Sequence, residues 1–440
     1  MTTMAATTPA TTRGDEVRAT AGLPLPYLSA ALVALLVFSA GIPLLAPELI
    51  ASSSAPHVLG LTHVIVLGWV TMVMIGALHQ LLPVALRATL WGPGLARAGF
   101  WLYAGSVAGF APSVFFWWLP GMAVFGTLAV LAVLVFCFNL LASYRSVQLW
   151  HAMAFYVLAG VFWLLLTIGL GGSYALDHLF HWFAITDSRL AVHAQLGLAG
   201  WASLVLMGVS YKLTEMFSLA HGQGKRLRLW NLGLWNAALS GLLISAWLAP
   251  SSRLVPSFAT GLLVSAGIFV FDIGRTLRHR RRRTFSLDQW HAFVSLASFL
   301  VAALMGVLLA ARHPLTATWT VTYGWVVLAG WFGFAIIGKQ YKIVPFLTWL
   351  RRFSRVAGGS PAPLLREMVD SRTGWVSFAL LLAGYAGVAA GLATGRVPIV
   401  EGAGAVYALG AWLFVFEMVR LIRPGSRPRP VAAAPRHATP

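Results

Sequence analysis

Three helix-length stretches of this 440-residue chain end in variants of one phrase. The variants are Gly76-Ala-Leu-His79-Gln-Leu-Leu-Pro83, Gly208-Val-Ser-Tyr211-Lys-Leu-Thr-Glu215 and Gly338-Lys-Gln-Tyr341-Lys-Ile-Val-Pro345. Their first glycines are 132 and 130 residues apart (208 − 76 and 338 − 208). A Gly-Trp pair also recurs upstream of each phrase, at Gly68-Trp69, Gly200-Trp201 and Gly330-Trp331. This spacing predicts three copies of one block, arranged as a pseudo-symmetric bundle.

The composition places these blocks in a membrane. The chain is 59% hydrophobic and 10% charged, with a mean hydropathy of +0.79, and a soluble domain could not cover that much apolar surface. A spanning helix needs about 20 apolar residues. Twelve such runs are present, near 27–46, 57–86, 98–119, 121–143, 149–171, 188–217, 229–250, 256–277, 287–311, 317–348, 373–394 and 401–422. The runs are continuous rather than alternating, which favours helices over barrel strands. We therefore predict an all-α integral membrane protein with twelve transmembrane helices in three four-helix repeats.

The predicted membrane domain covers residues 23–424, with repeats at approximately 23–145, 146–280 and 281–424. Residues 1–22 and 425–440 contain no apolar run and are predicted to be disordered cytoplasmic tails. Of the 31 Lys and Arg residues, 27 (31 − 4) fall on one side of the predicted topology. The other four are Arg189, Arg253, Arg312 and Arg396. The positive-inside rule therefore places both termini in the cytoplasm. We attribute the net charge of +19 to contact with anionic lipid rather than with nucleic acid.

Histidines near one end of the predicted bundle are candidate metal or haem ligands. His63 lies about two turns inside the second span, His193 lies near the same end of the sixth, and Tyr323 takes the repeat-equivalent place in the tenth. A buried neutral imidazole needs a partner, and iron is a frequent one. His79 follows His63 by 16 residues (79 − 63), roughly 24 Å along a helix, so these two cannot share a metal. The remaining histidines near span ends are more simply explained as loop or interface residues: His57, His151, His178, His181, His291 and His313.

A second set of polar residues lies in the opposite, predicted cytoplasmic half. It comprises His79, Tyr211, Lys212, Glu215, Lys339 and Tyr341. Ionisable groups at membrane depth cost free energy unless they are paired, so we expect Glu215 to neutralise Lys339. The set then has two explanations, a structural ion pair that joins three helices, or a proton path or substrate gate. The single cysteine, Cys137, excludes a disulfide within the chain.

The second span also resembles a known family. The segment Leu61-Thr62-His63-Val64-Ile65-Val66-Leu67-Gly68-Trp69, which runs on to Leu82-Pro83, is similar to the second helix of nitric-oxide-related branches of the haem–copper oxidase subunit I superfamily. The resemblance implies the twelve-helix subunit I fold, the cytoplasmic (inner) membrane of a prokaryote and contact with other respiratory-chain subunits. It implies haem b as cofactor, because no Cys-x-x-Cys-His motif is present. It also implies that His63 and His193 hold the metal, with Tyr323 and Trp325 beside them.

The family's oxygen-reducing centre is incomplete in this sequence. Tyr323-Gly324-Trp325 stands where the family's tenth helix carries a His-x-His pair, and the segment from Trp230 to Pro250 contains no histidine for copper. The sixth span lacks the family's His-Pro-Glu-Val-Tyr segment. We therefore expect neither copper nor terminal-oxidase activity. The chain is similar instead to NnrS-like membrane haem proteins of the nitric-oxide response.

Three functional hypotheses follow from the sequence. The first is a haem-binding membrane protein that acts in redox relay or in nitric-oxide or respiratory stress. The second is a transporter of protons or a small solute that uses the polar set of the cytoplasmic half. The third is a non-catalytic respiratory assembly protein. An absorption spectrum distinguishes the first from the others, and flux into liposomes distinguishes the second from the third.

Overall fold

The computed structural model describes residues 20–220, 224–280, 284–311, 316–353 and 363–423, which are helical and contain no strand. Ten of its helical stretches are long and apolar enough to cross a membrane. They are α2 (Pro24–Leu44), α4 to α5 (Pro56–Ala85), α7 (Leu119–Tyr144), α8 (Ala152–Phe180), α9 to α10 (Asp187–Ser218), α12 (Leu254–Arg278), α13 (Leu287–Ala311), α14 to α15 (Ala317–Phe353), α17 (Ser371–Thr394) and α18 (Val397–Ile422). The prediction of an all-α, multi-pass membrane protein is confirmed at this level.

Two more long helices, α6 (Pro93–Phe115) and α11 (Lys225–Leu248), lie where the sequence predicts the third and seventh spans. They are not among the ten helices apolar enough to be counted as spans. Two short helices, α3 (Ala46–Ala51) and α16 (Leu365–Met368), complete the described fold. Residues 1–19 and 424–440, which make up most of the predicted tails, lie outside the described residues, whereas Ala21 is buried.

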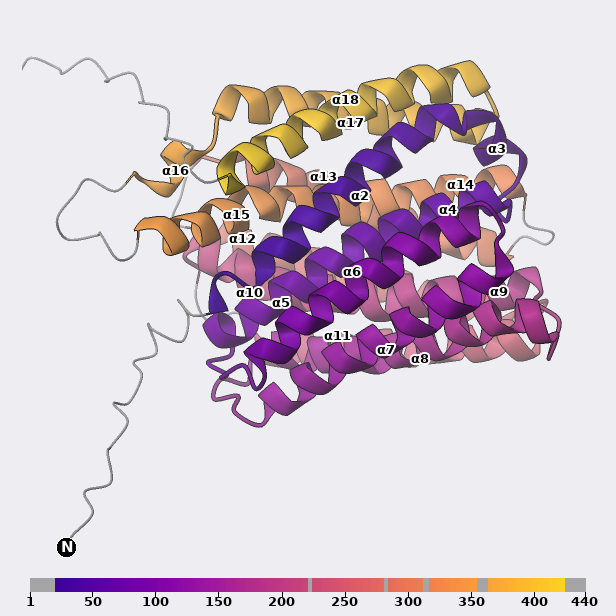
Figure 1. Ribbon diagram of the computed structural model, residues 1–440, viewed down its shortest axis with the longest axis horizontal. Coiled ribbons are helices and arrows are strands. Elements are labelled where there is room, and N and C mark those ends of the chain that lie inside the picture. The colour runs from indigo at the N-terminus through magenta and orange to yellow at the C-terminus, as the bar shows by residue number, and fades with distance from the viewer. Residues whose placement is uncertain (1–19, 221–223, 281–283, 312–315, 354–362, 424–440) are drawn as a thin grey trace, which may run out of the picture.

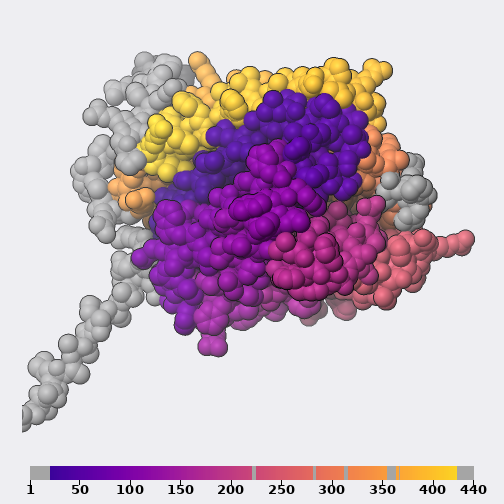
Figure 2. All heavy atoms as spheres, turned by 45° about the vertical axis from the view of Figure 1, so that its right-hand side comes forward, coloured from indigo at the N-terminus to yellow at the C-terminus, as the bar shows by residue number. Residues whose placement is uncertain are grey.

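Three helical stretches form the centre of the bundle. In the most apolar 18-residue segment of each span, 67% of the residues are buried in α4 to α5 and in α9 to α10, and 89% in α14 to α15. The corresponding share is 22–50% in the other seven spans. The outer helices surround them, and α7 packs against α8, α12 against α13 and α18 against α2. The last contact brings the C-terminal helix alongside the first one, as the yellow and indigo segments show (Figures 1 and 2). The chain therefore closes on itself around its second, sixth and tenth predicted spans.

Each central stretch is interrupted by a π-helical segment. These segments are η1 (Val66–Thr71), η2 (Leu196–Ala202) and η3 (Val326–Phe334). They separate α4 (Pro56–Ile65) from α5 (Met72–Ala85), α9 (Asp187–Gln195) from α10 (Ser203–Ser218), and α14 (Ala317–Trp325) from α15 (Ala335–Phe353). A π-helical turn is wider than an α-helical one, so it changes the face that later residues present, and such segments are frequent at functional sites. All three lie just after His63, His193 and Tyr323 in the sequence.

The recurring glycines are the points at which a central helix meets an outer one. A Cβ atom added at Gly76, Gly208 or Gly338 would lie 2.6–2.7 Å from the Cβ of Tyr27, Tyr156 or His291, respectively. One level away, Gly68, Gly200 and Gly330 make equally close approaches to Ala34, Trp163 and Ser298. Without side chains of their own, these glycines allow the helix backbones to approach, as small residues commonly do in membrane bundles. The repeated phrase is therefore a helix-packing signal.

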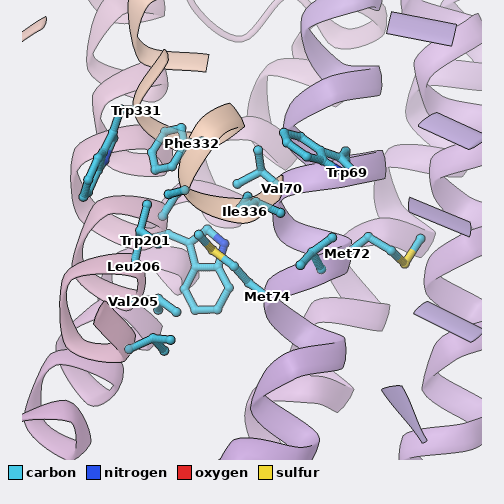
Figure 3. Packing of buried hydrophobic residues seen from close by; sticks show 14 of the residues in the cluster. Trp69, Val70, Met72, Met74, Trp201, Val205, Leu206, Trp331, Phe332 and Ile336 are labelled. Carbon is cyan, nitrogen blue, oxygen red and sulfur yellow. The ribbon is translucent and has the colours of Figure 1, made fainter. Parts of the chain in front are cut away.

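Three tryptophans are buried within the bundle at the π-helical level (Figure 3). Trp69, Trp201 and Trp331 are each at most 2% exposed. The Nε1 of Trp201 donates to the Thr71 hydroxyl at 3.2 Å, and that of Trp331 donates to the Ser203 hydroxyl at 3.1 Å. Each bond therefore joins one central stretch to the preceding one.

The third such bond is missing among the described residues. Trp69 Nε1 is buried and has no partner there. Thr71 and Ser203 each follow a Gly-Trp pair by two residues, and the residue in that position after Trp331 is Gly333, which has no hydroxyl. At this level, hydrogen bonds between side chains therefore join two of the three pairs of central stretches.

Removing one of these bonds gives a first testable prediction. In Thr71→Val the buried indole N–H of Trp201 loses its acceptor, so we expect the free energy of unfolding to fall by about 1 kcal/mol. Thr62→Val is the matched control, because the Thr62 hydroxyl donates only within its own helix, to the Val58 carbonyl at 2.8 Å. Reversible unfolding of the full-length protein in detergent measures both. Equal stability of the two variants would contradict the role of the bond between helices.

Candidate functional site

The imidazole of His63 is held in one tautomer by its own helix. His63 is partly buried in α4, and its Nδ1 lies 2.7 Å from the Leu59 carbonyl oxygen. Because a carbonyl only accepts, Nδ1 carries the proton, and the Nε2 of the neutral ring has a free lone pair. The ring meets Phe110 of α6 edge-on, with centroids 5.3 Å apart. His63 therefore presents Nε2 as an available ligand.

A second imidazole, that of His193 in α9, lies near His63. The two imidazoles lie near enough to interact electrostatically. The Nδ1 of His193 is buried without a hydrogen-bond partner among the described residues. A Cβ at Gly171 would lie 2.6 Å from the Cε1 of His193, so this glycine of α8 leaves the room that the ring occupies. The structure thus places both histidines that the sequence selected in the first halves of two central stretches.

The other two predicted cofactor-binding residues have different surroundings. The Tyr323 hydroxyl accepts a hydrogen bond from Gln195 Nε2 at 3.0 Å, which joins α14 to α9. Trp325 donates from Nε1 to the Tyr385 carbonyl at 3.0 Å and packs against Phe38 and Tyr407. Trp325 therefore belongs to an aromatic cluster between α14, α2, α17 and α18. The sequence does not predict a role for Gln195, because nothing in the residues around it indicates that its amide meets Tyr323 on another helix.

The histidines at the span ends have ordinary partners. His57 bonds to Glu48 at 2.7 Å, with both side chains about 40% exposed. His178 was predicted to lie in a loop, but it belongs to the last turn of α8, which continues to Phe180, and it contacts Trp117. His313 lies outside the described residues. Within the described ranges, no group of three or more His, Cys, Asp or Glu residues could hold a metal ion. The candidate site at this end consists of the two imidazoles of His63 and His193 alone.

The polar set of the opposite half falls into three settings, one per central stretch. His79 is 2% exposed and contacts Tyr27 and Phe136. Tyr341 packs against His291 and Phe414, and Tyr211, Lys212 and Glu215 line a pocket together. His291 is fully buried against Phe334 and Phe378 rather than lying at the membrane interface.

The expected ion pair between Lys339 and Glu215 is not formed. Glu215 accepts a hydrogen bond from Arg228 of α11, which lies beside α10, so its charge is neutralised there. Arg228 also donates from Nε to Asp272 Oδ2 of α12 at 2.8 Å, and Asp272 accepts a further bond from Arg275 at 2.7 Å. Arg228 is 5% exposed and Asp272 is fully buried. A four-residue charge network, made of Arg228, Glu215, Asp272 and Arg275, thus joins α10, α11 and α12.

A pocket of about 210 Å³ adjoins this network at the end where α8 and α11 begin. It is lined by His151, Ala152, Met153, Tyr211, Lys212, Glu215, Lys225 and Arg228. His151 Nε2 lies 3.4 Å from the Lys212 ammonium. Burial lowers the pKa of His151, and the nearby positive charges of Lys212, Lys225 and Arg228 lower it further against the opposing effect of Glu215. The sequence offers one signal for this pocket, the segment Trp150-His151-Ala152, which recurs at Trp290-His291-Ala292, but a tryptophan beside a histidine at a span end is also typical of an interfacial anchor.

The two ends of the bundle therefore hold different chemistry. One end has a pair of imidazoles, and the other has a basic pocket backed by a buried ion network. No protein-family model and no curated protein matches the chain. Its resemblance to haem–copper oxidase subunit I thus rests on the sequence pattern alone.

Proposed function

We propose that this chain is a haem-binding protein of the cytoplasmic membrane of a prokaryote, with twelve spans in three pseudo-symmetric four-helix repeats. The repeat is supported by three central stretches that each carry a π-helical segment and matching close-contact glycines. Helices α6 and α11 supply the third and seventh spans. The end where α2 begins and α18 ends faces the cytoplasm, because most of the basic residues gather there.

The observation that carries the haem assignment is the geometry of His63. Its Nδ1–H is bound by the Leu59 carbonyl, which leaves Nε2 free to coordinate iron and increases its basicity. His193 has a buried, unpartnered Nδ1, and Gly171 leaves room for its ring, so this second imidazole also has a nitrogen without a protein partner among the described residues. When bound, haem b supplies one-electron redox chemistry and an iron site for a small ligand. The ring of Phe110 gives His63 an apolar neighbour on one side.

The role that fits this site is redox relay or protection in nitric-oxide or respiratory stress, with other respiratory-chain subunits as partners. Reduction of oxygen by the oxidase mechanism needs ligands that this chain lacks. The third central stretch offers Tyr323, which is engaged by Gln195, and Trp325, which is engaged by Tyr385. Neither provides the second and third imidazoles that a haem–copper pair requires.

Absorption spectroscopy tests this proposal. Full-length protein expressed with added haem and purified in detergent should show a Soret band, and His63→Ala should lose most of it. His178→Ala is the matched control, since His178 lies near the same end but contacts Trp117 instead. His193→Ala should retain pigment or shift its spectrum. An unchanged band in His63→Ala would refute the assignment.

A colourless protein would point to one of the other hypotheses. Proton or solute flux into liposomes would then favour transport, and the absence of both pigment and flux would favour an assembly role.

A further inference from the structure

The pocket between α8, α10 and α11 is lined mainly by positive charge. Lys212, Lys225 and Arg228 face one carboxylate, that of Glu215. Arg228 is occupied by Glu215 and Asp272. Lys212 and Lys225 have no carboxylate within ion-pairing distance among the described residues; Lys212 approaches His151, and Lys225 lies over the ring of Phe155. Two ammonium groups are therefore left to attract an anion.

Two helices begin at this pocket. His151, Ala152 and Met153 are the N-cap and first residues of α8, and Lys225 is the first residue of α11. Neither N-terminus is capped by a side chain. The first turn of a helix presents unpaired backbone N–H groups and a partial positive charge, which together favour a bound oxyanion. The backbone thus adds donors to the same space as the two lysines.

The pocket wall supplies an aromatic face between the cations. Tyr211 is 1% exposed and lines the pocket, and the Arg228 guanidinium lies 4.5 Å from the centre of its ring. The Tyr211 hydroxyl has almost no accessible surface and lies beside Tyr156 and Asn231 rather than facing the pocket. An oxyanion in the pocket would therefore accept hydrogen bonds from the lysines and from the backbone N–H groups.

We propose that this pocket binds a phosphate-type oxyanion, either the headgroup phosphate of an anionic phospholipid or a free phosphate. Its volume of about 210 Å³ is many times the roughly 10–15 Å³ that one water needs. Three of the side chains that line it are cationic, and the one carboxylate, that of Glu215, is already bound by Arg228, so cations are disfavoured. This proposal is independent of the haem site, because the pocket lies at the opposite end of α8 from Gly171 and His193.

Thermal stability and native mass spectrometry of the full-length protein test the proposal. Three conditions separate the sources: buffer without phosphate, inorganic phosphate at millimolar concentration, and nanodiscs of phosphatidylcholine with or without one-fifth phosphatidylglycerol. We expect stabilisation by phosphate, by phosphatidylglycerol or by both. The apparent affinity should fall at least about tenfold in Lys212→Gln/Lys225→Gln, because two charge-assisted contacts are lost.

Two further variants make the result specific. Arg226→Gln removes an exposed charge next to Lys225 that does not line the pocket, so its affinity should stay within about twofold of the parent. The single variant Lys225→Gln changes an exposed residue and retains a folded protein even if the double variant does not fold. Equal losses in Arg226→Gln and Lys225→Gln would show general attraction to a basic surface and overturn the site. Absence of stabilisation in every condition would overturn it as well.

Discussion

Arg228→Met is expected to lower the free energy of unfolding by about 3–5 kcal/mol. Arg228 holds the fully buried carboxylate of Asp272 through Nε and that of Glu215 through an Nη. Methionine fills a similar space but leaves Asp272 with Arg275 as its remaining cationic partner. When a buried carboxylate loses one of its two cationic partners, much of the free-energy cost of removing it from water is no longer offset. That cost exceeds what the ion pair itself contributes to stability.

The design of this experiment separates the network from surface charge. Arg226→Met, two residues earlier and exposed, removes the same charge without touching a carboxylate and should change stability by less than about 0.5 kcal/mol. Arg228→Met/Asp272→Asn should recover part of the loss, because the uncompensated charge is then absent. Denaturant titration in phosphate-free detergent buffer measures all three. Similar stabilities for Arg228→Met and Arg226→Met would show that the network is not a stabilising element.

The sequence predicted the framework of this fold well, since the framework depends on long apolar runs. The ninth predicted span, 287–311, has the same bounds as α13. The fifth was predicted near 149–171, whereas α8 covers Ala152–Phe180. Gly171 looks like a helix end in the sequence, but in the structure it makes room for His193. The sequence around a glycine cannot show whether it ends a helix or makes room for a neighbour, because the neighbour belongs to another helix.

The charge network shows what the sequence could not provide. Arg228 stands among Lys225 and Arg226 near a basic helix end, a context that is typical of interfacial residues facing lipid headgroups. The helix turns Arg228 inward instead, where Asp272 and Glu215 meet it. The prediction that Lys339 pairs with Glu215 rests on their similar depth in the membrane. Depth along a helix does not tell which other helix lies beside a given side chain. Which charges meet depends on the rotation and order of the helices, and neither is encoded in hydropathy.

The π-helical segments were also absent from the sequence prediction. Their residues, such as those of η1 and η2, are apolar and glycine-containing like the α-helical turns around them. They arise where the helix contacts its neighbours, beside the tryptophans and close-contact glycines. His63 and His193 could be selected from their positions in the predicted spans, whereas the direction in which each ring points depends on the rotation that these neighbours impose.

The three phrase glycines offer the second strong prediction. Alanine at Gly76, Gly208 or Gly338 would place its Cβ 2.6–2.7 Å from the Cβ of Tyr27, Tyr156 or His291, respectively. A Cβ is bonded to the backbone and cannot move away by changing rotamer, so the two helices must separate. We expect each variant to lose about 1–3 kcal/mol of stability, the usual cost of overpacking.

Gly233→Ala is the matched control, and its expected effect on stability has the opposite sign. Gly233 of α11 faces open space, with no heavy atom within 4 Å of the place that a Cβ would take, so the added methyl of Gly233→Ala meets no neighbour. This variant should be neutral or stabilising by up to about 1 kcal/mol, because alanine favours a helix over glycine. If the three blocks are copies of one packing unit, the three phrase variants should lose similar amounts in the same unfolding assay. A gain at any one of them, of the kind expected for Gly233→Ala, would show that the close contact there is not required and that the repeat is one of sequence alone.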